Sequence, residues 1–191
     1  MELLSGITVR GSGFVHTLDY LDRTHGAQVT RAILERMPPE ARRNARRALA
    51  TGMYPVEHVS ELLAAIRAEL APQDPEINFK VSLAVAKNAF STLYKVFFKL
   101  GRPHFIIKRA AKVWDRMASQ GALEVTHQDR GLVGLRLTDF NYADPEFCAQ
   151  RLRAWYQAPL ELSGCRITLS EHPACRSRGD RLCEWQYRWE V

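Results

Sequence analysis

Four cysteines near the C-terminus are the residues whose type and spacing best suit a chemical site. The sequence has 191 residues, and all four of its cysteines follow residue 147. Cys175 and Cys183 flank a seven-residue segment in which Gly179 and Asp180 favour a turn. In a cytoplasmic chain, which the opening residues indicate because they lack a signal-peptide pattern, cysteines serve as thiols or metal ligands more often than as a disulfide framework.

A tetrahedral metal site is one interpretation of these residues. Cys148 lies on the apolar face of a predicted helix and Cys183 on the aromatic face of a predicted strand, so both side chains can reach the same interface. His172, three residues before Cys175, would supply a fourth ligand. A Cys3His set binds zinc in a closed, structural site. The alternative is that the thiols are buried core residues, which is how we interpret Cys165 beside Ile167.

The elements that must position these residues divide the chain into two parts. Apolar side chains recur at helical spacing up to residue 117, and alternation with a period of two begins after Gly121. The segment TGMYPVE at 51–57 is interpreted as a turn. Predicted helices cover residues 12–25, 27–37, a stretch from Pro39, 55–70, 77–100, 103–117 and 144–156, and predicted strands cover 123–127, 133–137, 165–169 and 183–189.

These patterns predict an α+β fold with one domain over residues 1–191. Residues 1–120 form the helical N-terminal region, and residues 121–191 form a C-terminal β-β-α-β-β unit. Helices are then expected to pack on one face of a four-stranded, mostly antiparallel sheet. The helical face of residues 77–117 is so apolar that we expect it to pair two copies in a homodimer.

Aromatic side chains are concentrated where the helices meet the predicted sheet. They predict an apolar pocket for a small ligand, although for any single side chain simple core packing is the alternative. The pocket would be lined by Phe90, Tyr94, Phe98, Trp114, Trp155, Trp185 and Tyr187.

The chain has a net charge of +6, and its sequence contains one dense cluster of basic residues. Four arginines follow one another at i, i+1, i+4 and i+5, so on a helix they form a stripe that would contact a phosphate-bearing or protein partner; a solvated helix face is the alternative. No nucleic-acid-binding motif, membrane-spanning run or catalytic signature accompanies them, so we expect no nucleic acid partner, no membrane span and no enzymatic activity. The patch comprises Arg42, Arg43, Arg46 and Arg47.

Three stretches, RGSGFVHTLDYLDRTHG, TGMYPVEHVSELLAAI and EHPACRSRGDRLCEWQYRW, resemble one superfamily. It groups haem nitric-oxide-binding domains, four-vinyl reductase domains and the small subunits of the TRAPP Golgi-tethering complex, and the chain is most similar to a bacterial branch. The resemblance to four-vinyl reductase domains implies a zinc site at Cys148, Cys175 and Cys183. His172 stands where that family has a carboxylate, and Glu171 is an alternative ligand.

The resemblance leaves two functions open, a small-molecule sensor domain and a protein-interaction scaffold similar to the Golgi-tethering subunits. Haem-binding members use a histidine together with a Tyr-x-Ser-x-Arg motif. No tyrosine of this chain begins that motif, and His104 alone, at the start of an apolar helix, is weak support. The sequence therefore argues against haem and leaves a structural zinc as the candidate cofactor, with packed thiols as the alternative.

Overall fold

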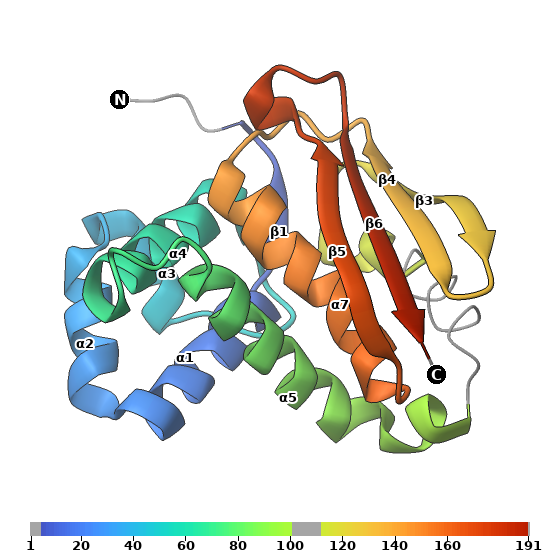
Figure 1. The fold of residues 1–191 in the computed structure, drawn as a ribbon. Coiled ribbons are helices and arrows are strands. Elements are labelled where there is room, and N and C mark those ends of the chain that lie inside the picture. The colour runs from blue at the N-terminus through green and yellow to red at the C-terminus, as the bar shows by residue number, and fades with distance from the viewer. Residues whose placement is uncertain (1–4, 101–111, 191) are drawn as a thin grey trace.

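A helical layer and a four-stranded sheet lie side by side, with one helix between them (Figure 1). The computed structural model describes residues 5–100 and 112–190, with the backbone alone for residues 91–100. The helical layer contains α1 (Ser12–His25), α2 (Ala27–Arg36), α3 (Pro39–Arg46), α4 (Val56–Leu70) and α5 (Ile77–Leu100). This arrangement confirms the predicted α+β class.

The N-terminal helices begin and end where the sequence indicates. Gly26 separates α1 from α2 with a φ of 86°, a backbone conformation that glycine adopts without strain. Pro39 occupies the first turn of α3, where its missing N–H costs no hydrogen bond. Of the helix predicted over 103–117, residues 112–117 are helical and the rest lies outside the described residues.

The prediction of a simple turn at residues 51–57 is wrong in part. Met53–Pro55 forms strand β2, which pairs antiparallel with β1 (Thr8–Arg10). Gly11 makes this contact possible, because a Cβ atom there would lie 2.3 Å from the carbonyl oxygen of Leu49. The glycine and proline around β2 conceal a strand of only three residues from a pattern-based analysis.

The sheet has the predicted four strands in the order β3-β4-β6-β5, and all neighbours are antiparallel. The strands are β3 (Ala122–Asp129), β4 (Leu132–Thr138), β5 (Arg166–Ala174) and β6 (Cys183–Glu190). Strands β3 and β5 form the two edges. The pairing of β5 with β6 shifts register twice, and β5 also contains Pro173.

The helix between the layers differs from the predicted continuous α-helix. Its first part, η1 (Glu146–Leu152), is π-helical, and α7 (Arg153–Leu162) continues it beyond the predicted end. The carboxylate of Asp144 accepts the N–H of Phe147 at 2.7 Å and so caps the first turn. π-Helical turns occur often at functional sites, and this one carries Cys148.

Helix α5 supports this junction from the helical layer. Its described part buries Val81, Val85, Ala86 and Ala89, as expected of a central helix. No helix in the described part of the chain is long and apolar enough to cross a membrane.

A partly buried polar cluster joins the central helix to the helical layer. One carboxylate oxygen of Glu146 accepts from Arg67 Nη2 at 2.5 Å, and the other accepts from Asn78 Nδ2 at 2.6 Å. Because these three residues come from η1, α4 and α5, Glu146 holds the start of the central helix against both helices.

Replacing Glu146 by alanine should therefore destabilise the fold by about 2–3 kcal/mol, because Arg67 and the fully buried Asn78 lose a charged acceptor. Chemical denaturation measures this change. Glu190→Ala is the control, since Glu190 pairs with Arg166 at an exposed strand end and its loss should cost less than about 1 kcal/mol. Equal losses in the two variants would contradict a bridging role for Glu146.

Candidate metal centre

Three cysteine sulfurs meet where η1 packs against the end of the sheet. Cys148 comes from η1, Cys175 follows β5, and Cys183 opens β6. The three sulfur atoms lie within 4.8 Å of one another, and all three residues are buried. The Cys175 and Cys183 sulfurs are 4.0 Å apart, and no disulfide joins them.

The strand register explains why Cys175 and Cys183 meet. Ala174 pairs with Glu184 across the β5–β6 ladder, so the residues that flank this pair on the loop side face each other. The loop is tight because the Cys175 N–H donates to Asp180 Oδ2 at 2.7 Å and Gly179 adopts a φ of 93°. The predicted turn residues are therefore the ones that close the loop.

Cys148 is brought to this pair by the contact of η1 with β6. The indole N–H of Trp185 donates to the carbonyl oxygen of Cys148 at 3.1 Å. Trp185 lies two residues after Cys183, so both side chains leave β6 on the same face, toward η1.

The three thiols share their protons unequally. The pKa of Cys175 is lowered because the Cys148 and Cys183 side chains donate hydrogen bonds to its sulfur. The pKa of Cys148 is raised, first by its hydrogen bond with Cys175 and then by its bond with Cys183. Cys175 is thus the thiol that loses its proton first, and a thiolate is the form that binds metal ions.

The spacing of the sulfurs suits one tetrahedral ion. With zinc–sulfur bonds of about 2.3 Å, tetrahedral ligands have sulfur atoms about 3.8 Å apart. The Cys175–Cys183 separation of 4.0 Å is close to that value, and the limit of 4.8 Å for the whole group requires only small side-chain movements.

His172, the expected fourth ligand, lies beside the three sulfurs and not within their group. Its ring is stacked on Trp185, with centroids 4.9 Å apart. The imidazole contributes to the lowered pKa of Cys175, yet both ring nitrogens are buried and neither has a hydrogen-bond partner within bonding distance. Glu171, the alternative ligand, is exposed on β5.

Cys165 lies apart from the candidate centre. Its sulfur is 3.4 Å from the Ser163 hydroxyl, and burial raises its pKa. Cys165 is thus a buried thiol outside the sulfur group, at the position where the sequence predicts ordinary packing.

The aromatic residues predicted to line one pocket are engaged in separate contacts. Phe90 meets Trp155 edge-on with ring centroids 5.4 Å apart, and Trp114 meets Phe140 at 5.3 Å. The Tyr187 hydroxyl donates to the Arg153 carbonyl oxygen at 2.8 Å. The side chains of Tyr94 and Phe98 lie outside the described residues, so the apolar pocket stays a prediction.

The predicted arginine patch is divided between two roles. Arg42 and Arg46 both form ion pairs with Glu35 of α2, which stabilises the contact of α2 with α3. Arg43 and Arg47 are exposed and form no ion pair with another described residue. Two of the four arginine charges in the patch are therefore paired with Glu35, and two are not paired within the described part of the chain.

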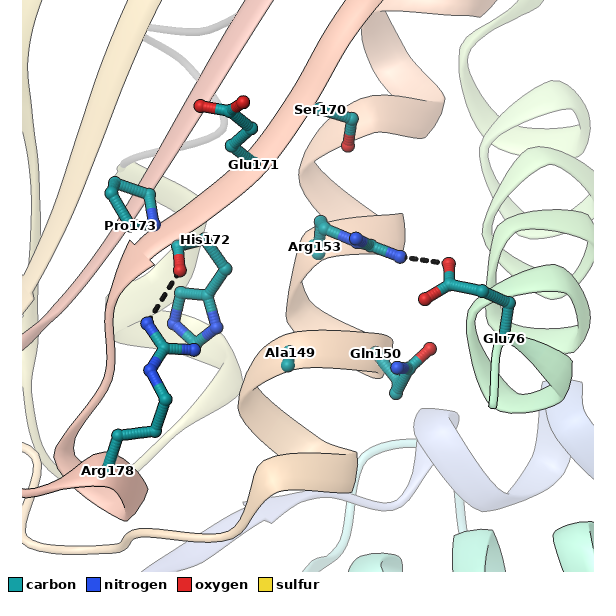
Figure 2. Close-up of a pocket in the computed structure, with 9 residues that line it drawn as sticks. All are labelled: Glu76, Ala149, Gln150, Arg153, Ser170, Glu171, His172, Pro173 and Arg178. Atoms are coloured by element: carbon teal, nitrogen blue, oxygen red, sulfur yellow. Dashed lines mark hydrogen bonds and ion pairs between the residues drawn. The ribbon is translucent and has the colours of Figure 1, made fainter. Parts of the chain in front are cut away.

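The sequence did not point to the hollow that lies between β5 and the η1–α7 helix, shown in Figure 2. It has a volume of about 410 Å³, and Arg153, Ser170 and Arg178 are among the residues that line it. The helical spacing of Ala149, Gln150 and Arg153 is compatible with one helix face, but no motif in the sequence indicates that this face meets β5.

Comparison with solved structures shows the fold that positions these groups. An H-NOX protein from S. oneidensis in the Fe(II)NO ligation state matches with a TM-score of 0.69 at 14% identity, over 95% of this chain and 99% of that one. The Fe(II) unliganded H-NOX protein from K. algicida matches with a TM-score of 0.64 at 12% identity, over 95% and 97%. Neither a protein-family model nor a curated protein sequence matches the chain.

The chain therefore has the H-NOX fold, which confirms the expected superfamily resemblance at the level of the fold. The argument against haem is wrong. A structure solved to probe the function of heme distortion in the H-NOX family also matches, with a TM-score of 0.66 at 10% identity over 95% of both chains. A missing Tyr-x-Ser-x-Arg motif does not exclude haem, because that motif holds the propionates and not the iron.

Proposed function

We propose that the chain is a non-catalytic ligand-binding domain of the sensor type, braced at its C-terminal end by a metal centre. The observation that carries the proposal is the match to H-NOX proteins over 95% of the chain, one of them with NO bound to its iron. The proposal assigns no catalytic residue, since a fold shared at such low identity supports an architecture and not a reaction.

The metal of the brace is zinc in this proposal. Thiolate ligands suit zinc, and a site closed by four protein ligands is structural because no position is left for a substrate. Cys148, Cys175 and Cys183 would supply the sulfurs, and a nitrogen of the neighbouring His172 would take the fourth position after a change of its side-chain rotamer. The ion would tie η1 to the ends of β5 and β6.

Haem is the candidate ligand, either as the molecule that the domain senses or as the group through which it senses another molecule. Two described histidines, His58 and His172, are poor axial ligands, because His58 forms a hydrogen bond with Asn44 at 2.9 Å and His172 lies beside the thiols. His104 follows Pro103 in the segment outside the described residues and is the imidazole we propose for the iron.

A scaffold role is the second candidate, and the surface near α3 favours it. Leu49 is 69% exposed and Met53 is 41% exposed, and both lie near the free guanidiniums of Arg43 and Arg47 in the sequence. Apolar side chains beside unpaired cations are typical of a surface that binds an acidic protein partner. The proposed homodimer would use the helical face of residues 77–117.

Purified protein prepared without chelator should contain about one zinc ion per chain by elemental analysis. The content should fall toward zero in Cys175→Ser and should fall as the pH is lowered, because protons compete for the thiolates. Cys175→Ser should also lower the melting temperature sharply.

Cys165→Ser is the matched control, since it removes a buried thiol that lies outside the sulfur group. It should retain the zinc. A wild-type zinc content below about a tenth of an ion per chain would leave three packed thiols and no metal centre.

Incubation with haem should give a Soret absorption band that is lost in His104→Ala and retained in His58→Ala. His58 is the suitable control because burial lowers its pKa and its ring is bonded to Asn44. A spectrum identical to that of free haem in wild-type protein would contradict haem binding.

The double variant Arg43→Gln/Arg47→Gln should elute from immobilised heparin at lower salt than wild type, with an unchanged melting temperature. Arg130→Gln/Arg188→Gln removes the same charge from exposed positions in the β3–β4 turn and on β6, and is the control. Equal shifts for the two double variants would show that only net charge matters.

A further inference from the structure

The hollow between β5 and the η1–α7 helix contains polar groups that the fold leaves without partners. Buried atoms without a hydrogen bond include Arg153 Nε, Ser170 Oγ and both ring nitrogens of His172. All three residues line the same space of about 410 Å³ (Figure 2). Buried polar atoms in native proteins are nearly always bonded, so several in one place indicate that something else fills the space.

The strand places two of these side chains on the same side. Ser170 and His172 are two residues apart on β5 and both turn toward α7, whereas Glu171 between them is directed the other way (Figure 2). Glu171 also lines the hollow, but its exposed carboxylate is directed away from the hydroxyl and the imidazole.

The charges around the space favour an anion. Arg153 forms an ion pair with Glu76, which leaves its Nε–H free to donate. Arg178 has no ion pair with another described residue, and its guanidinium donates to the His172 carbonyl oxygen at 2.7 Å. The hollow is thus lined by an arginine without an ion pair in the described part of the chain, beside three groups that can each donate a hydrogen bond.

We propose that this hollow binds a small molecule through an oxyanion, either a carboxylate or a phosphate. Arg178, the Ser170 hydroxyl, the Arg153 Nε–H and one N–H of His172 would donate to its oxygens. Charge-assisted bonds of this kind are among the strongest in proteins. The volume exceeds that of a bare ion, so the anionic group would belong to a small organic molecule.

The anion site adjoins the metal centre through His172. A histidine that ligates a metal with one nitrogen commonly donates its other N–H to an anion, which fixes the orientation of the ring. This coupling rests on the metal centre of the proposed function, but the anion site itself does not. Zinc-loaded and chelator-treated protein therefore separate the two proposals.

Titration with inorganic phosphate and with succinate, each at constant ionic strength, tests the site by amide chemical shifts. The shifts should centre on Ser170 and His172, and whichever probe binds more tightly identifies the class of anion. Arg178→Gln should weaken that binding about tenfold, the loss expected for a hydrogen bond to a charged group. Arg181→Gln is the control, because Arg181 is exposed on the same loop but does not line the hollow.

Ser170→Ala is a second variant, and we expect it to fold as the wild type does. The hydroxyl has no partner in the free protein, so its removal should weaken anion binding without lowering the melting temperature. Shifts that spread over the surface, or that persist equally in Arg178→Gln and Arg181→Gln, would overturn the proposal. Loss of binding only in chelator-treated protein would show that the metal orders His172, and binding in both preparations would show an independent anion site.

Discussion

Two hydrogen bonds from β6 to the backbone of the η1–α7 helix hold the C-terminal half together. Trp185 donates to the carbonyl oxygen of Cys148, and Tyr187 donates to that of Arg153. Both side chains leave β6 on the same face, and their hydrogen bonds fix the height and the rotation of the helix above the sheet. The sulfur group lies at one end of this contact, and the hollow beside β5 lies along its edge.

Large aromatic residues at such a contact contribute both packing and hydrogen bonds. Their rings fill the space between helix and sheet, as the edge-on packing of Tyr156 against Trp185 shows, while their polar atoms bond to the helix backbone. The fold therefore uses in packing several of the side chains that a sequence analysis would assign to a ligand pocket. The polar hollow beside this contact is lined instead by a serine, a histidine and arginines.

The predictable part of the fold is the part that periodicity encodes. The alternation over residues 183–190 placed Cys183, Trp185 and Tyr187 on one buried face, and the structure has that arrangement. The π-helical turn was not predictable, because the spacing of the apolar residues Cys148 and Leu152 in the sequence also fits an ordinary α-helix. The position of His172 beside the sulfurs depends on a register shift between Glu171 and Ala174, which no local pattern reveals.

The match to H-NOX proteins at 9–15% identity shows how little sequence a fold of this kind requires. The buried polar contacts of this chain are more specific. The Arg151 guanidinium is buried among neutral groups, where it donates to Gly13 O and Thr17 Oγ1 of α1 and lies over the Trp155 ring. Burial lowers the pKa of Arg151 to about 10. This contact joins α1 to η1, which periodicity alone does not predict.

The edge strand β5 has a consequence for how copies of this chain can associate. A free edge invites another strand to extend the sheet, and proteins prevent this with prolines and irregular pairing. Pro173 has no N–H to offer, and the two register shifts bend β5 away from a straight ladder. Growth of the sheet from copy to copy is therefore disfavoured at the β5 edge, which removes one of the two edges through which copies could form a fibre.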